Sequence, residues 1–175
     1  MKAEWLWVSL TACFILLSSC TDSAKGPAQK LANELLQGMK ESGQPVAARA
    51  GLVPAAIRAG ESATLVAAVK IRPGWHIYAP GGVSRFAIPT RLEVKLPEGI
   101  SPVAGWKYPP GIGKQGREEL IYENSVVISG ALKSAAGLSP GRRSLVCSVY
   151  YVACDESVCL PPEAQSLKVD FDIIK

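Results

Sequence analysis

Apolar and polar side chains alternate most regularly in residues 62–71 and 166–173. Successive side chains on a strand point to opposite sides of the sheet, so this alternation predicts two strands that each bury one face. The faces expected to point to the core carry Leu65, Ala67, Val69 and Ile71 in the first strand and Leu167, Val169, Phe171 and Ile173 in the second. A slip of one residue would expose the whole apolar row of the second strand, so we expect its register to be firm.

From residue 46 onward, Gly and Pro recur at short intervals, and Val, Ile, Thr and Tyr gather between them. This alternation of turn-forming and strand-forming segments predicts an all-β sandwich rather than a helical or an α/β domain. The expected strands are residues 47–53, 62–71, 76–78, 90–95, 119–122, 125–131, 144–152 and 166–173. We therefore expect one domain over residues 46–175.

Residues 1–19 are predicted to be a targeting segment, because Lys2 precedes an apolar run that is too short to span a bilayer comfortably. The run ends with Leu17, two serines and Cys20, which resembles a bacterial lipobox, where cleavage precedes a cysteine that is then lipidated. Acyl chains on that cysteine would hold the protein to a membrane. Thr21 follows it and favours the outer membrane over the inner one, by analogy with lipoprotein sorting rules. The expected location is the bacterial periplasm, with an uncleaved amino-terminal anchor as the alternative.

Residues 20–45 are rich in Ser, Gly, Lys and Ala and are expected to form a lipid-anchored tether. One short helix is predicted within it, because four apolar side chains recur at helical spacing: Leu31, Leu35, Leu36 and Met39. Packing on the domain, or fraying, is a simpler role for this helix than binding a partner.

The charge of the chain is mildly positive, with a formal net value of +4, and the basic residues are scattered. Only Arg142 and Arg143 are adjacent in the carboxyl-terminal part, so nucleic-acid binding has no support. The sequence also lacks the phosphate-binding, dinucleotide-binding, metalloprotease and serine-hydrolase motifs. With a single histidine, His76, hydrolytic catalysis is poorly supported, and we expect that residue to be structural within an aromatic cluster.

Cysteine chemistry is what remains. Of the five cysteines, Cys13 leaves with the targeting segment and Cys20 is the expected lipidation site. Export permits disulfides, so Cys147, Cys154 and Cys159 predict one pair and one odd thiol. Cys147 lies in an apolar alternation and is expected to be a small buried hydrophobe.

The spacing of Cys154 and Cys159 favours a disulfide across a hairpin, because four intervening residues form a common hairpin loop. Closing so small a loop removes little entropy from the unfolded chain, which weakens a purely structural role. Asp155 and Glu156 are expected to raise the pKa of the Cys154 thiol that forms on reduction, which makes it a poor nucleophile. The reactivity of the pair would then depend on a docked partner whose own thiol has a low pKa and attacks the disulfide. Pro161 begins a diproline that ends the pairing, because neither ring nitrogen can donate to a ladder.

The run from Tyr151 to Pro162, which contains this cysteine pair, occurs together with the aromatic turn of residues 73–78. The combination resembles the periplasmic amino-terminal domain of DsbD-type thiol:disulfide interchange reductases, over roughly residues 46–175. The resemblance implies an immunoglobulin-like antiparallel sandwich that needs no cofactor. Its cysteine pair would accept electrons from a membrane-embedded partner domain and pass them to periplasmic disulfide proteins.

The resemblance also implies roles for individual residues. Cys154 and Cys159 would be the exchanging pair, with Cys154 the one joined to partners in mixed disulfides, and Tyr78 and Tyr151 would lie near them. The cap loop, which in the family shields the disulfide with aromatic side chains, aligns with residues 111–114, where this sequence has none. Shielding is then either lost or supplied by Tyr108 or Ile112.

The donor is expected to be a separate protein, either a membrane-embedded thiol transporter or a thioredoxin-like protein, because the sequence contains neither of those domains. Two other interpretations stay open. One is a non-catalytic binding or assembly lipoprotein whose disulfide is only structural. The other is a metal site formed by the three cysteines with His76, although their spacing is not that of a zinc finger.

Overall fold

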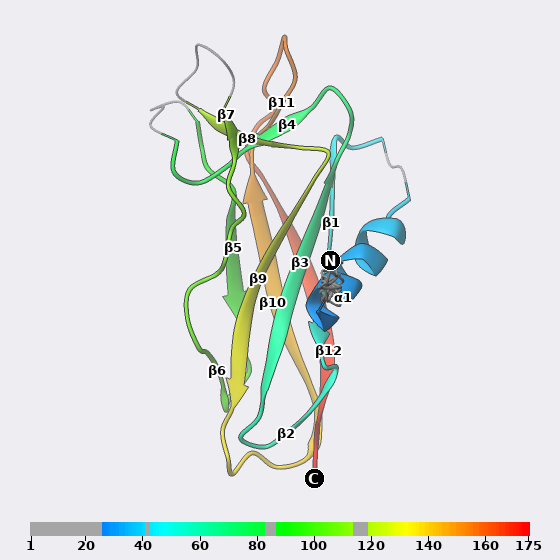
Figure 1. Ribbon diagram of the computed structural model, residues 1–175, viewed down its shortest axis with the longest axis vertical. Coiled ribbons are helices and arrows are strands. Elements are labelled where there is room, and N and C mark those ends of the chain that lie inside the picture. The colour runs from blue at the N-terminus through cyan, green and yellow to red at the C-terminus, as the bar shows by residue number, and fades with distance from the viewer. Residues whose placement is uncertain (1–25, 41–42, 83–86, 114–118) are drawn as a thin grey trace, which may run out of the picture.

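The computed structural model describes residues 26–40, 43–82, 87–113 and 119–175 (Figure 1). The predicted targeting segment, Cys20 and Lys114 lie outside these residues. Within them the chain forms one helix, α1 (Pro27–Gln37), followed by strands only. No helix among the described residues is long and apolar enough to cross a membrane.

The strands of the described residues are numbered as in Figure 1. They are β1 (Val46–Val53), β2 (Ala56–Arg58), β3 (Ser62–Ile71), β4 (His76–Tyr78), β5 (Arg91–Lys95), β6 (Ile100–Pro102), β7 (Ile112–Gly113), β8 (Leu120–Glu123), β9 (Ser125–Ser134), β10 (Gly141–Tyr151), β11 (Ala153–Cys154) and β12 (Glu163–Ile174).

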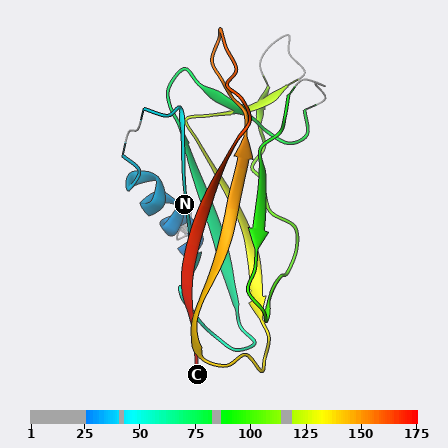
Figure 2. The ribbon, with the colours of Figure 1, turned by 180° about the vertical axis from the view of Figure 1, so that it is seen from behind.

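Two four-stranded sheets form the body of the molecule. One has the order β1-β3-β9-β6 and the other the order β2-β12-β10-β5, and every pairing in them is antiparallel except that of β2 with β12. Figure 2 shows β12 and β10 in front of the other sheet when the molecule is seen from behind. The mostly antiparallel sandwich predicted from the sequence is confirmed.

The core lies between these sheets and is built from the alternating residues that the sequence singled out. The inner face of β3 carries Leu65, Ala67, Val69 and Ile71, and that of β12 carries Val169, Phe171 and Ile173; all are buried. Leu167 is half-buried against the same core. The apolar row of the last strand faces the core as predicted, and its pairing with β10 places Leu145 opposite Val169 and Arg143 opposite Phe171.

A third, smaller sheet with the order β11-β4-β8-β7 closes one end of the sandwich. Its inner residues Ile77, Tyr122 and Ala153 join the core. In Figure 1 these strands and the hairpin that follows β11 lie at one end of the molecule, and the carboxyl terminus lies at the other. The small sheet therefore places its outer face, with residues from four separate segments, at the tip of the protein.

Helix α1 packs across the outer face of β1 and β3. Val66 and Ala68 point away from the sandwich core yet are fully buried, as is Ala32 on the helix. The helix begins at Gly26 without a side-chain cap, has no acidic residue in its first turn and has no basic residue in its last turn. A short helix with such ends is marginal by itself, so packing on the sheet is what holds it. The predicted helix is confirmed, and it docks on the domain.

Ala32→Asp is expected to detach this helix and to lower the free energy of unfolding by roughly 2 kcal/mol or more, because it buries a carboxylate with no partner. Urea unfolding measures the loss. Lys30→Asp, two residues away on the exposed side of the helix, is the matched control and should change stability little. Equal effects of the two substitutions would mean that α1 contributes nothing through its packing.

The predicted strands all occur, with boundaries shifted by a few residues. The sequence missed β2, β6, β7 and β11, which are two or three residues long. Such short segments show no period, and they are strands only because a neighbouring chain offers backbone partners to them. Two of the four belong to the small sheet that carries the candidate site.

Candidate redox site

The hairpin after β11 carries a disulfide between Cys154 and Cys159, as the spacing predicted. The two residues face each other in an antiparallel bridge, with Cα atoms 4.0 Å apart. The Leu160 N–H donates to the Ala153 carbonyl at 2.8 Å, and the Asp155 N–H donates to the Val158 carbonyl at 2.9 Å. Backbone hydrogen bonds therefore hold the hairpin on both sides of the disulfide. The exposed Pro161 and Pro162 follow directly and separate this ladder from β12.

The two cysteines differ in accessibility. Cys154 is 1% exposed, because it lies on β11 and pairs with β4. Cys159 lies on the outer arm of the hairpin and is exposed. A thiol-disulfide exchange begins when a thiolate reaches one of the two sulfurs, so access favours attack on Cys159 Sγ. Cys154 Sγ would then be the leaving group.

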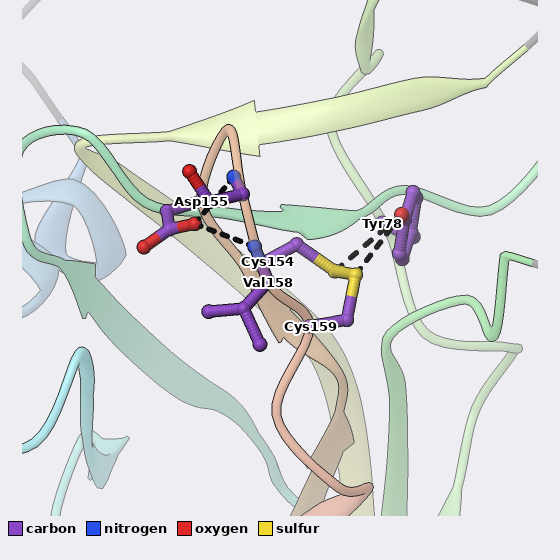
Figure 3. The surroundings of a disulfide bond; sticks show 6 residues. Tyr78, Cys154, Asp155, Val158 and Cys159 are labelled. Atoms are coloured by element: carbon purple, nitrogen blue, oxygen red, sulfur yellow. Dashed lines mark hydrogen bonds between the residues drawn. A yellow bond between two sulfur atoms is a disulfide. The ribbon is translucent and has the colours of Figure 1, made fainter.

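Tyr78 on β4 lies against the disulfide. Its hydroxyl is 3.5 Å from Cys154 Sγ and 3.9 Å from Cys159 Sγ (Figure 3). Disulfide sulfurs carry no hydrogen, so the phenol is the donor in both contacts. The hydroxyl is thus already placed to donate to whichever sulfur becomes negative when the bond opens.

Asp155 organises the hairpin loop. Its Oδ1 accepts hydrogen bonds from the N–H groups of Ser157, at 2.7 Å, and Val158, at 2.8 Å. Figure 3 shows this carboxylate turned toward those donors, away from the disulfide. The two backbone hydrogen bonds, and behind them the positive charges of His76 and Arg72, outweigh desolvation and hold the pKa of Asp155 below its ordinary value of 3.8. The negative charge expected beside Cys154 therefore accepts the hydrogen bonds that hold the loop, and positively charged side chains lie near it.

Asp155→Ala is expected to loosen this loop, so that the amide hydrogens of Ser157 and Val158 exchange faster with solvent. The lowered pKa adds a pH dependence. The stabilisation by the carboxylate is present above pH 3.8 and is lost as the pH falls through the lower folded value. Amide hydrogen exchange measured by NMR checks both effects. Glu156→Ala, at the exposed neighbouring position, is the control and should leave the two amides unchanged.

The structure brings only some of the other predicted neighbours to the disulfide. Tyr151 enters the core, where its hydroxyl donates to Glu163 at 2.8 Å and accepts from Gln165 at 2.7 Å. Burial, and then the carboxylate of Glu163, raise its pKa. The Tyr108 hydroxyl accepts a hydrogen bond from the Leu92 N–H on β5 at 2.8 Å, which holds the Tyr108 side chain against that strand. The hydrogen bonds of these two hydroxyls, within the described part of the chain, therefore go to groups other than the sulfurs.

Ile112, on β7, lies opposite Ile121, which lies opposite Tyr78. It shares the outer face of the small sheet with the tyrosine but is two strands away. Its side chain is 56% exposed, so it does not form a closed lid. The described residues 111–113 carry no aromatic side chain, and within the described residues it is the Tyr78 hydroxyl that hydrogen-bonds to the disulfide.

The prediction for Cys147 is confirmed. This thiol is free and fully buried in the sandwich core, and burial raises its pKa to about 11. The metal interpretation needed its sulfur together with those of Cys154 and Cys159, which are joined to each other. Among the residues that the structure describes, no three His, Cys, Asp or Glu side chains are arranged to hold a metal ion.

His76 is the site residue whose position the sequence did not indicate. It was expected to be structural, and it is indeed buried, with its ring edge-to-face against Tyr78 at 5.7 Å between centroids. The structure also places it directly opposite Cys154 on the neighbouring strand. Its two-residue separation from Tyr78 signalled a shared face, but the pairing with β11 could not be seen in the sequence.

Solved structures with a similar chain path include three chains of low sequence identity. The N-terminal periplasmic domain of ScsB from Proteus mirabilis matches 74% of this chain at 14% identity and a TM-score of 0.49. The chain spans about half of that protein, 48%. The DsbD n-terminal domain of Neisseria meningitidis in the reduced form matches 63% of this chain and 82% of its own, at 12% identity and a TM-score of 0.41.

The third is the complex between the DsbD N-terminal and PilB N-terminal domains from the same organism, with 14% identity, a TM-score of 0.40 and coverage of 73% of this chain and 83% of that one. No curated protein matches the chain. The family model described as "Thiol:disulfide interchange protein DsbD, N-terminal" matches residues 44–170, which is well over half of the sequence. The chain therefore belongs to the family of DsbD N-terminal domains.

Proposed function

We propose that this protein is a thiol-disulfide exchange domain that relays reducing equivalents through Cys154 and Cys159 to exported disulfide proteins. The observation that carries the proposal is a hairpin disulfide at the tip of a DsbD-family sandwich, with Cys159 exposed, Cys154 buried and a phenol donor at both sulfurs. The electrons would come from a membrane-embedded thiol transporter or a thioredoxin-like donor. A lipid anchor on Cys20 would keep the domain at a membrane, in the periplasm.

The order of the exchange follows from access to the sulfurs. The resemblance implied that Cys154 is the residue joined to partners, but its burial argues for the opposite assignment. A donor thiolate would attack the exposed Cys159 Sγ and form a mixed disulfide there, which releases Cys154 as a thiolate. A second thiol of the donor would then attack the donor sulfur of the mixed disulfide and release Cys159 as a thiolate. The donor leaves as a disulfide and this domain as a dithiol.

Apolar side chains around the site favour docking of a protein partner. Val158, in the hairpin loop, is 51% exposed, and Ile112 on β7 is also more than half exposed. The hairpin that carries Val158 and strand β7 lie at the same end of the molecule (Figure 1), and Figure 3 shows Val158 next to the disulfide. Exposed apolar side chains next to a reactive group are typical of a surface that is covered during exchange.

Redox equilibration with a reduced thioredoxin-like donor tests the proposal. We expect the Cys154–Cys159 disulfide to equilibrate with the donor while the domain stays folded, as judged by its near-UV circular dichroism. A structural disulfide typically has a reduction potential below about −300 mV. A couple in that range, or one that is reduced only when the sandwich unfolds, would instead indicate a non-catalytic binding lipoprotein.

A further inference from the structure

His76 is the single histidine of the sequence and lies in the middle of a row of three ionisable groups. In the register of the small sheet, Cys154 lies opposite it on β11 and Glu123 lies opposite it on β8. Directly opposed residues of antiparallel strands have Cβ atoms about 4.5 to 5.5 Å apart. A thiol, an imidazole and a carboxylate thus lie side by side across three strands.

This row is on the face that carries the disulfide. The intervening residues Ile77 and Ala153 point to the core and are buried. Alternation then places His76 on the other face together with Tyr78, whose hydroxyl lies beside both sulfurs. The edge-to-face contact of the two rings agrees with that placement. At 6% exposure, the imidazole acts on its neighbours with little screening by water.

The charged and ionisable groups that face His76 come from every neighbouring element. Glu123 and Cys154 lie on the adjacent strands, Tyr78 is on its own strand, and Asp155 and Arg72 lie in the flanking loops. The positive charge of the imidazole, together with that of Arg72, contributes to the lowered pKa of Asp155. The ring is therefore within electrostatic reach of the hairpin, and Glu123 lies opposite it on the other neighbouring strand.

We propose that His76 is a positioning residue that carries the positive charge opposite Cys154 when the disulfide is opened. This role rests on the proposed exchange function. When a donor thiolate attacks Cys159 Sγ, the disulfide breaks, the new disulfide joins the donor to Cys159, and the electron pair stays on Cys154 Sγ. The imidazolium stabilises that thiolate, or gives its proton to it and becomes neutral. In the opposite direction the neutral imidazole takes the thiol proton, and the Cys154 thiolate attacks the mixed disulfide at Cys159 and releases the partner thiolate.

The proposal links two titrations. A thiolate opposite His76 can exist only in the reduced protein, and ionisation of Cys154 to that thiolate must raise the proton affinity of the imidazole. By reciprocity, the protonated imidazole must lower the pKa of the Cys154 thiol by the same amount. A histidine that only fills space in the aromatic cluster would show neither effect.

NMR titration of the full chain measures both. A single histidine gives an unambiguous imidazole signal, which is followed with pH in the oxidised protein and after reduction by dithiothreitol. We expect the His76 pKa to be higher in the reduced protein by about one unit or more. In reduced His76→Gln, the pKa of Cys154, read from its Cβ chemical shift, should rise by a similar amount. Cys147→Ala is the matched control: it removes the free thiol of the sandwich core but should leave the redox-linked shift of His76 in place.

Equal His76 pKa values in the two redox states would overturn the proposal, and this comparison needs no variant to fold. An unchanged Cys154 pKa in a folded His76→Gln protein would overturn it as well. Because dithiothreitol is the reductant, the result does not depend on a biological donor. If the relay function is wrong, the disulfide will not equilibrate with the thioredoxin-like donor, but the His76 pKa will still change on reduction. If the His76 role is wrong, the His76 pKa will not change, while equilibration with the donor can still occur.

Discussion

Cys154→Ala is expected to form a stable mixed disulfide through Cys159 with a thioredoxin-like partner that keeps one active-site cysteine, activated as a mixed disulfide with thionitrobenzoate, which leaves as its thiolate. Cys159→Ala should trap little or none. In the first variant the exposed thiol is retained, and the sulfur that would resolve the mixed disulfide is gone. In the second, the remaining thiol is buried beneath the hairpin, at 1% exposure. Reaction at Cys154 then requires local opening, which should slow trapping by roughly tenfold or more.

Non-reducing electrophoresis and mass spectrometry of the trapped species measure the difference. Cys147 should not compete, because its thiol lies in the core and burial raises its pKa to about 11. A Cys147→Ala background checks this directly and should not alter the yield. Faster trapping at Cys154 than at Cys159 would restore the assignment that the family resemblance implied, and would require the hairpin to open during the exchange.

Ile77→Ala is expected to lower the free energy of unfolding by about 2 to 5 kcal/mol, as do other truncations of a buried aliphatic side chain. Ile77 is fully buried and fixes β4 to the core, directly between the two residues that face the disulfide side, His76 and Tyr78. Its loss should also loosen the contact of the Tyr78 hydroxyl with the sulfurs. We therefore expect faster reduction of the disulfide by dithiothreitol under native conditions.

Phe171→Ala is the matched control for this substitution. Phe171 is buried to a similar extent, but it lies on β12 opposite Arg143, toward the end of the sandwich that is remote from the hairpin (Figure 1). The loss of stability should be comparable, about 3 to 5 kcal/mol, while the reduction rate at low denaturant stays close to that of the parent protein. If both variants accelerate reduction equally, the disulfide responds to global stability and not to the packing of the small sheet.

The sandwich could be predicted because the alternation of apolar and polar residues is visible within each long strand. Every second residue is apolar over residues 63–71 of β3 and over residues 167–173 of β12, and the side chains of a strand alternate by geometry. The hairpin disulfide could also be predicted, since two cysteines separated by a four-residue loop are brought together by local chain geometry alone.

The surroundings of that disulfide could not be predicted in the same way. Tyr78 and Tyr151 both matched aromatic positions of the family, yet of these two it is Tyr78 whose hydroxyl is hydrogen-bonded to the sulfurs, while that of Tyr151 is bonded elsewhere. Tyr151 ends β10 with its side chain on the core face, where Glu163 and Gln165 bind its hydroxyl. The difference depends on which face each strand turns to the core, and that is settled by packing.

The sequence by itself determined the all-β class, the inward faces of the long strands, the buried state of Cys147 and the pairing of Cys154 with Cys159. Each of these follows from residues that are close in the chain. Only the tertiary structure decided that Cys154 is buried while Cys159 is exposed, that Tyr78 and His76 lie beside them, and that Glu123 lies on the far side of His76. Those relations join strands that are some 45 to 80 residues apart, and backbone pairing in a small sheet with no periodic signal of its own creates them.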